Sequence, residues 1–334
     1  MAALAVDGKE VLQLDLRTTS EQHMKKIGLL YGMENTFPMA LVERINSRNV
    51  PGVMAESLIT GAFRMDQPSG YAVIIDRISH DIPFYRAYLS NAILHGAKVI
   101  NNPFWWSADD KFFNYALGDR LGVAVPKTVM LPHHSHPPGT TAQSMRNLMY
   151  PLNWEEVFEY IGFPAFMKPH LGGGWRNVYK VNNPEELFAA YNETGVLGMV
   201  LQEGIDFTEY YRCYCIGREK VHVMVYDPRL PHEKRYVLDV DPKDSPLYPR
   251  IVADSLTLCR ALGYDMNTVE FAVRDGIPYA IDYLNPAPDA DRHSVGEANF
   301  EWIIEAMADL AIQAALSEAP AARDYTWQRF LAGG

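Results

Sequence analysis

The stretch Phe163–Val181 holds the residues best suited to contact a phosphate group. An apolar run ends in Lys168, and three glycines follow it closely, Gly172, Gly173 and Gly174. Glycine tolerates positive φ and lets the backbone approach a ligand, and successive N–H groups in such a turn form an anion-binding concavity. A lysine beside that turn adds a positive charge. The stretch therefore predicts a nucleotide-phosphate clamp, with a glycine-rich hairpin that binds nothing as the alternative.

The order of these residues argues against two familiar nucleotide-binding motifs. A P-loop places its lysine after the glycines, whereas Lys168 precedes them. A dinucleotide-binding fingerprint needs a third glycine that opens a helix. Asn177 stands at that position and a β-like run follows it.

Two carboxylates in the last third of the chain are candidate metal ligands. Asp275-Gly276 separates two β-like runs, which is a strong hairpin signal. The hairpin places Glu270 on one strand, and Asp282 and Asn285 at the end of the other. Carboxylate and amide oxygens suit Mg²⁺, which also takes phosphate oxygens. Ordinary polar residues at strand ends are the alternative.

The cysteines and clustered histidines are weaker candidates for chemistry. The three cysteines are an odd number without Cys-x-x-Cys spacing, and two of them share one face of a predicted strand, which favours buried thiols (Cys213, Cys215 and Cys259). Three histidines lie in a proline-containing, loop-like segment with no fourth ligand at hand, which favours a substrate-covering loop over a metal site (His133, His134 and His136).

Composition narrows the class of protein. The chain has 334 residues, a net charge of −11 and a pI of about 5.4, which argues against a nucleic-acid partner. No apolar run approaches the ~18 residues of a membrane span. The apolar patch at residues 2–6 has no basic flank, so we expect no signal peptide. Together with the thiols, this predicts a cytoplasmic protein that is neither membrane-bound nor nucleic-acid-binding.

The first part of the chain predicts an α/β domain over residues 25–107, after an extension at 1–24. Strands at 26–31, 71–76 and 98–100 alternate with helices at 39–46 and 83–95, the pattern of a parallel sheet. Glu34, Asn35 and Thr36 follow the first strand, where they either cap the helix or contact a substrate. Arg77 follows the second strand, where it meets either a substrate anion or a surface carboxylate.

The rest of the chain predicts two lobes, at residues 108–200 and 201–334. In the first, helices at 154–161 and 184–193 begin behind Asn153 and Asn183 and flank the glycine hairpin. In the second, an antiparallel meander containing Arg212 precedes an amphipathic helix that ends at Gly263, and the acidic hairpin follows.

These motifs, in this order, resemble the ATP-grasp ligases, specifically the branch with glutathione synthetase, D-alanine–D-alanine ligase and ribosomal-protein glutamate ligase. The resemblance spans residues 26–289. It implies an α/β protein with α+β lobes, in which an N-terminal parallel-sheet domain binds the acceptor through residues such as Asn35 and Arg77. Relatives are often dimers or tetramers, so a homo-oligomer stays open.

The resemblance also implies a nucleotide site. One family lysine begins a helix, matching Asp110-Lys111, and the other precedes the glycine loop, matching Lys168. The adenine hinge is matched by four successive residues and the ribose-binding acid by a fifth (Gln202, Glu203, Gly204, Ile205 and Glu209).

The implied catalytic and metal residues follow the hinge. Arg212 matches a family arginine, and Arg235 lies in a basic segment where relatives hold the transferred phosphate. Glu270 and Asp282 match the metal carboxylates. The family reads carboxylate-x-Asn, whereas one extra residue precedes Asn285 in this chain. In a strand, this would turn Asn285 to the opposite face unless a bulge restores it.

The implied reaction is a ligation that uses ATP and Mg²⁺, with Mn²⁺ as an alternative metal. ATP phosphorylates a small-molecule carboxylate to an acyl phosphate, and an amine substrate displaces phosphate. A small-molecule kinase and a catalytically inactive ATP-binding protein are the other interpretations.

Overall fold

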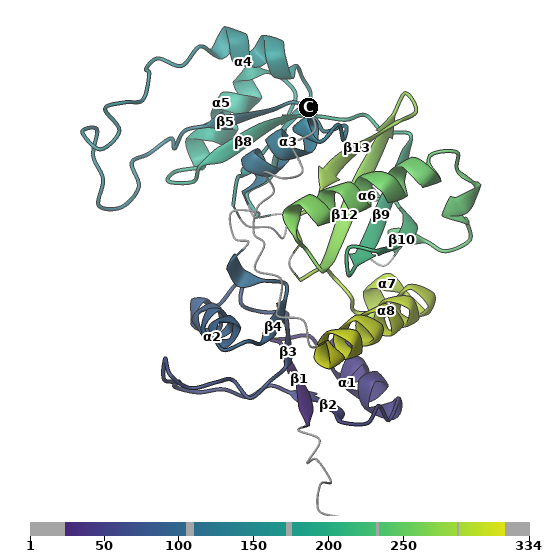
Figure 1. Ribbon diagram of the computed structural model, residues 1–334. Coiled ribbons are helices and arrows are strands. Elements are labelled where there is room, and N and C mark those ends of the chain that lie inside the picture. The colour runs from purple at the N-terminus through teal and green to yellow at the C-terminus, as the bar shows by residue number, and fades with distance from the viewer. Residues whose placement is uncertain (1–23, 105–109, 172–175, 232–233, 286, 318–334) are drawn as a thin grey trace, which may run out of the picture.

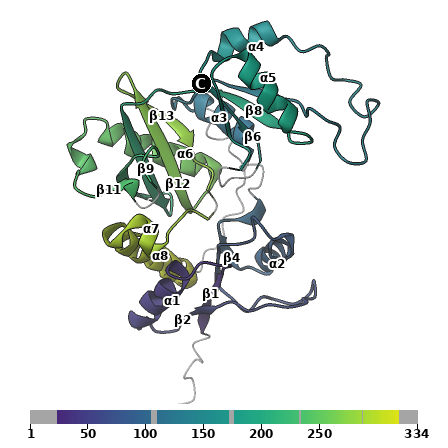
Figure 2. The ribbon, with the colours of Figure 1, turned by 180° about the vertical axis from the view of Figure 1, so that it is seen from behind.

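Three sheets organise the chain, and Figure 1 shows two antiparallel sheets above a parallel one. The structure is a computed structural model that describes residues 24–104, 110–171, 176–231, 234–285 and 287–317. Seen from behind, in Figure 2, the two antiparallel sheets again lie side by side above the parallel sheet. This arrangement confirms the expected mixed α/β class.

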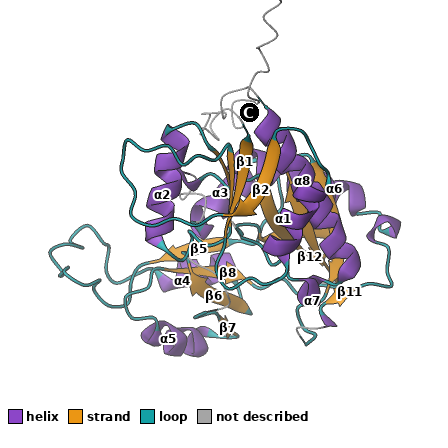
Figure 3. Ribbon diagram, turned by 90° about the horizontal axis from the view of Figure 1, so that it is seen from below, coloured by secondary structure: helices purple, strands orange, loops and turns teal. Residues whose placement is uncertain are grey.

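The parallel sheet belongs to the first domain. Its order is β2-β1-β3-β4, made by β1 (Lys25–Leu30), β2 (Val53–Ser57), β3 (Val73–Asp76) and β4 (Lys98–Ile100). The crossover helices are α1 (Phe37–Ser47) and α2 (Pro83–Leu94). Figure 3 shows α2 on one face of the sheet and α1 on the other. The parallel βαβ pattern was predicted, but the partly exposed edge strand β2 was not.

The smaller antiparallel sheet has the order β5-β8-β6-β7. Its strands are β5 (Thr128–Leu131), β6 (Ala165–Pro169), β7 (Tyr179–Val181) and β8 (Met199–Glu203). The helices α4 (Trp154–Ile161) and α5 (Pro184–Glu193) pack against it. At the start of α4 the Asn153 side chain accepts a hydrogen bond from the Glu156 backbone N–H, and at the start of α5 the Asn183 side chain accepts one from the Glu186 backbone N–H, as their cap positions predict.

The larger antiparallel sheet has the order β11-β10-β9-β12-β13. Its strands are β9 (Glu209–Ile216), β10 (Lys220–Tyr226), β11 (Tyr236–Val237), β12 (Met266–Arg274) and β13 (Ile277–Asp282), and a 3-10 helix, η3 (Pro242–Asp244), precedes α6 (Tyr248–Leu262). The predicted hairpin turn is present, since Asp275 and Gly276 have φ of 54° and 72°.

One face of this larger sheet packs beneath α6 around the three cysteines. All three thiols are buried and free (Cys213, Cys215 and Cys259). The helix α3 (Lys111–Arg120) joins the same core through Tyr115 and Leu117. Although α3 precedes the strands of the smaller sheet in the sequence, it therefore packs into the core of the larger sheet.

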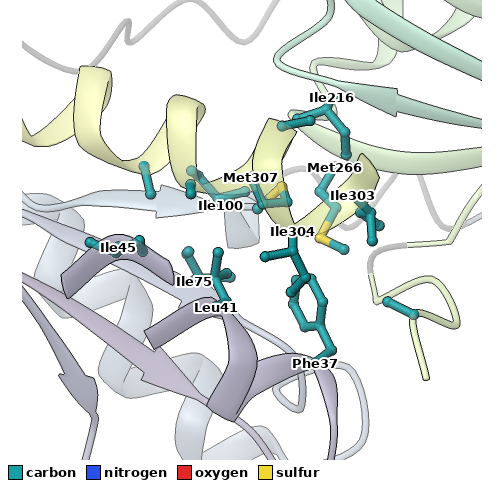
Figure 4. Close-up of a cluster of buried hydrophobic side chains, with 14 of the residues drawn as sticks. Phe37, Leu41, Ile45, Ile75, Ile100, Ile216, Met266, Ile303, Ile304 and Met307 are labelled. Atoms are coloured by element: carbon teal, nitrogen blue, oxygen red, sulfur yellow. The ribbon is translucent and has the colours of Figure 1, made fainter. Parts of the chain in front are cut away.

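The helices α7 (Arg292–Val295) and α8 (Glu297–Leu316) connect the larger sheet to the parallel domain. Figure 4 shows Ile303, Ile304 and Met307 of α8 among side chains of α1, the parallel sheet and the larger sheet. This single core fixes the parallel domain against the larger sheet.

The histidine segment lies in the connection between β5 and α4. His133 Nδ1 lies 2.8 Å from the carbonyl oxygen of Val196, and the ring of His134 packs edge-on against Tyr191. In the part of the chain that the structure describes, no group of three or more His, Cys, Asp and Glu side chains is placed to hold a metal ion. None of the helices described has the length and apolar content needed to cross a membrane.

Candidate active site

A cavity of about 860 Å³ lies between the two antiparallel sheets. The smaller sheet contributes Phe166 and Lys168 of β6, and the larger sheet contributes Glu270 of β12 and Asp282 of β13. Cavities of this size hold ligands of a few hundred daltons. The cavity is thus lined by two predicted lysines and two predicted carboxylates that lie far apart in the sequence (Lys111, Lys168, Glu270 and Asp282).

Lys168 lines this cavity from β6. Its Nζ donates to the Tyr115 hydroxyl at 2.8 Å and to Gln202 Oε1 at 3.0 Å. Burial lowers its pKa, and the nearby carboxylates of Asp282 and Glu270 oppose that change. A partly buried ammonium whose hydrogen-bond partners among the described residues are neutral is well suited to receive an anion.

Lys111 lines the same cavity from the first turn of α3. Asp110 caps this helix, accepting from the backbone N–H groups of Phe112 at 2.9 Å and Phe113 at 3.2 Å. The Lys111 N–H donates to the His170 carbonyl at 2.9 Å, which ties α3 to the end of β6. The cap and this bond set the position of the second lysine.

The predicted hinge segment forms one wall. Gln202, Glu203, Gly204 and Ile205 all line the cavity. Glu203 accepts from Arg274 Nη1 at 2.8 Å. A Cβ on Gly204 would lie 2.5 Å from the Pro164 carbonyl oxygen, so no larger residue fits this close backbone approach. The segment is therefore held on both sides, by β12 and by the loop before β6.

A β-bulge brings the two carboxylates together. Glu270 pairs with Asp282 and Phe271 pairs with Ala280, so Ile281 has no partner on β12. Because the register shifts by one residue, both Ile281 and Asp282 line the cavity. Without the bulge, Asp282 would turn toward the buried core that contains Ala280.

Two neighbours on β9 hold Glu270. The Tyr210 hydroxyl donates to Glu270 Oε2 at 2.6 Å, and Arg212 Nε lies 3.6 Å from Glu270 Oε1. Burial raises the pKa of Glu270, and the positive charge of Arg212 opposes the rise. Arg212 is buried, and its Nε has no hydrogen-bond partner among the residues described.

Four of the residues predicted for the nucleotide, catalytic and metal sites lie outside the cavity lining, and one of them is Arg212, which contacts Glu270 from β9. Glu209 is exposed and accepts from the Tyr211 hydroxyl, and Arg235 Nε donates to the Leu230 carbonyl at 3.1 Å. The backbone N–H of Asn285 donates to Asn267 Oδ1 at 3.0 Å. The required bulge exists, but it precedes Asp282, so it does not carry Asn285 into the cavity.

The cavity lining also contains polar side chains outside the predicted set. They include Asp206, Tyr210 and Arg229. Arg229 is held by both carboxylate oxygens of Asp227, at 2.8 Å each, and its guanidinium lies 4.6 Å from the centre of the Phe207 ring. For Tyr210 a signal existed, because it shares a strand face with Arg212 two residues on.

The predicted substrate residues lie in the parallel domain. Arg77 is fully buried and donates to Glu34 Oε2 at 2.8 Å and to the Pro288 carbonyl at 2.6 Å. It therefore connects the parallel domain to the segment after β13. Because its side chain is fully buried and paired, Arg77 forms neither a surface salt bridge nor an open contact for a substrate. Asn35 is exposed in the connection between β1 and α1. The three glycines of the clamp, residues 172–174, lie outside the described residues.

Comparisons with known proteins give no match by sequence to a family model or to a curated protein. Solved structures do match. The VanG D-Ala:D-Ser ligase from Enterococcus faecalis has a TM-score of 0.61 and 15% identity, covering 87% of this chain and 99% of its own.

Two further structures match over a similar extent. The RimK domain protein ATP-grasp from Sphaerobacter thermophilus has a TM-score of 0.61 and 14% identity, covering 86% of this chain and 98% of its own. The macrocyclase MdnC from Microcystis aeruginosa, bound with precursor peptide MdnA, has a TM-score of 0.59 and 12% identity, covering 87% and 100%. At these identities the likeness concerns the fold, and the chain has the ATP-grasp fold that its motifs predicted.

Proposed function

We propose that the protein is an ATP-dependent carboxylate–amine ligase. The observation that carries the proposal is the shared cavity, where Lys111 and Lys168 line one part and Glu270 and Asp282 another. Transfer of a phosphoryl group requires charge neutralisation and alignment more than covalent help from the protein. Cations and carboxylates around one space supply those two needs.

The carboxylates fit a divalent metal that is completed by phosphate oxygens. Glu270 and Asp282 are paired across two strands, and two carboxylates are the usual protein share of a Mg²⁺ site. Mg²⁺ bound there would neutralise phosphate charge, and Mn²⁺ has similar ligand preferences. Tyr210 holds one Glu270 oxygen by its hydrogen bond and so orients the carboxylate before any metal enters.

The protein side chains then serve two chemical steps. In the first, a substrate carboxylate oxygen attacks the terminal phosphorus of ATP, ADP leaves, and an acyl phosphate forms. In the second, the amine attacks the acyl carbon, loses a proton, and phosphate leaves. Lys168 and Lys111 bind phosphate oxygens, and Arg212 lies on the Glu270 side to stabilise charge at the acyl group. The hinge residues Gln202 to Ile205 hold the base.

The two substrates are proposed as a small amino acid or peptide carboxylate and an amine. The solved structures with this fold support that class, since they include a D-Ala:D-Ser ligase and a macrocyclase bound with a precursor peptide. The acceptor would lie toward the carboxyl edge of the parallel sheet, where Asn35 is exposed.

A screen of amino acid and peptide pairs tests the proposal by phosphate release with ATP and Mg²⁺. A ligase releases ADP and phosphate only when an acid and an amine are both present. Lys168→Ala serves as the blank and should remain folded while losing activity, and Lys25→Ala, an exposed lysine on β1, serves as the matched control. ADP release with one substrate alone would identify a kinase instead, and nucleotide binding without turnover would identify an inactive binding protein.

A further inference from the structure

The hydroxyl of Tyr115 connects three elements at the edge of the cavity. Tyr115 is only 4% exposed and lies on α3. Its oxygen accepts from Lys168 Nζ of β6 at 2.8 Å and donates to the Ile281 carbonyl of β13 at 2.5 Å. One phenol group therefore contacts both the lysine of the smaller sheet and the backbone of the larger one.

The contact on β13 falls on the bulge. Ile281 is the residue without a partner on β12, and Asp282 follows it directly. A bulge interrupts the hydrogen-bond ladder locally, so its backbone geometry depends on other partners. The Tyr115 hydroxyl supplies such a partner at the peptide that turns Asp282 toward the cavity.

The ring of Tyr115 is itself prevented from moving. It packs edge-on against Tyr283 with ring centres 5.6 Å apart, and the Tyr283 hydroxyl donates to the Asn114 carbonyl at 2.7 Å. Because α3 and β13 belong to the same core, the phenol is fixed relative to Asp282. Lys168 comes from the other sheet and is held from its own side by Gln202.

We propose that Tyr115 is a positioning residue that sets the separation between the Lys168 ammonium and the carboxylates of Glu270 and Asp282. The proposal rests on the proposed function, since that separation matters for one ligand that touches both. Tyr115 does not line the cavity and acts through Lys168 and the bulge. Loss of its hydroxyl leaves Gln202 as the Lys168 hydrogen-bond partner among the described residues and removes the Tyr115 donor from the Ile281 carbonyl.

The test compares Tyr115→Phe with Tyr283→Phe. Each change removes one buried hydroxyl from the same pair of rings, but only the first touches Lys168 and the bulge, because the Tyr283 hydroxyl bonds to Asn114. The measurement is the affinity for AMPPNP by calorimetry, with Mg²⁺ and with EDTA. Urea unfolding of each variant verifies that it is folded during the titration.

A lost pair of buried hydrogen bonds changes an equilibrium by roughly tenfold or more. We therefore expect Tyr115→Phe to reduce the gain in AMPPNP affinity that Mg²⁺ provides by about tenfold. Tyr283→Phe should keep that gain, although it also loses a buried hydrogen bond. An equal gain in wild type and both variants would overturn the positioning role. Failure of the wild type to bind AMPPNP under any condition would instead contradict the proposed function.

Discussion

The α1–α8 interface and the cavity between the antiparallel sheets join parts of the molecule in opposite ways. At the first, apolar side chains from both sides form one core, and charged pairs surround it, including Arg44–Glu301 and Arg48–Asp309 at 2.7 Å each. At the second, the contacts between the two sides of the cavity are polar and partly buried, such as Lys168–Tyr115 and Arg274–Glu203.

This difference indicates that the α1–α8 interface contributes mainly to stability, whereas the cavity is suited to bind a charged ligand. Apolar burial is non-directional and sums over many contacts, so the first interface holds two parts of the chain together. Buried charges without full partners oppose folding but prepare a site for a charged ligand. Lys168, which lines the cavity, thus also connects the two sheets around it through its bond to Tyr115.

The largest effect is expected for a substitution in the apolar core between α1 and α8. Ile304→Ala removes a side chain with 0% exposure between α8 and the parallel domain and should lower the free energy of unfolding by about 2–5 kcal/mol. Urea denaturation measures the loss, and Gln313→Ala at an exposed position on α8 is the control. A loss no greater than that of the control would mean that this core contributes little.

The second-largest effect is expected for a substitution in the polar cavity between the antiparallel sheets. Glu270→Gln removes one of the two cavity carboxylates and should raise the Mg²⁺ concentration needed for AMPPNP binding by at least about 100-fold, because a metal ligand matters at least as much as its outer partners. A metal titration followed by calorimetry measures this. Asp275→Asn, the same change in the exposed turn of the same hairpin, should have no effect. Equal behaviour of the two variants would remove Glu270 from the metal site.

A smaller effect should appear as acid sensitivity at α8. His222 stacks on Trp302 at 4.7 Å between ring centres, and burial lowers its pKa. Below its unfolded pKa, near 6.5, the unfolded chain gains a proton that the folded chain resists, so stability is full above this pH and falls as the pH drops toward the folded pKa. The slope should not exceed about 1.4 kcal/mol per pH unit. Urea unfolding at several pH values should show it, and His222→Gln should reduce it; an unchanged slope would assign it to other groups.

The smallest effect belongs to the ion pairs around the same interface. Arg44 and Glu305 are solvent-accessible, with 27% and 52% of the side chains exposed. Arg44→Gln should therefore lower the free energy of unfolding by less than about 1 kcal/mol, and the difference should shrink between 0.1 M and 1 M salt. A loss as large as that of Ile304→Ala, measured by the same urea method, would show that charge rather than apolar burial holds the interface.

Local signals account for the parts of the fold that were predicted. Asn153 and Asn183 mark helix starts, Asp275-Gly276 marks the hairpin, and alternating strands and helices mark the parallel sheet. Elements whose pattern depends on several neighbours were missed. The strand β2 is a partly exposed edge, and α8 contacts α1, the parallel sheet and β9 at once, so neither shows a simple one-faced pattern.

In the candidate site, too, residues in local motifs were predicted and features that depend on tertiary contacts were missed. Residues in ordered motifs, such as Lys168, Glu270 and Asp282, do line one cavity. Arg235 was predicted rather than Arg229, because the direction of the Arg229 side chain depends on Phe207 of a separate segment as well as on Asp227 of its own loop. The bulge at Ile281 is likewise a tertiary feature, and spacing alone placed the irregularity after Asp282 rather than before it.

The position of α8 has a consequence for how the chain is made. The sheet that begins at residue 25 is covered on one face by a helix that ends at residue 316. A ribosome must therefore synthesise the chain through α8 before Leu29 and Ile75 reach their final neighbours. For the same reason, a fragment cut after residue 104 would carry a bare apolar surface, and transplanting this domain into another protein requires bringing α8 with it.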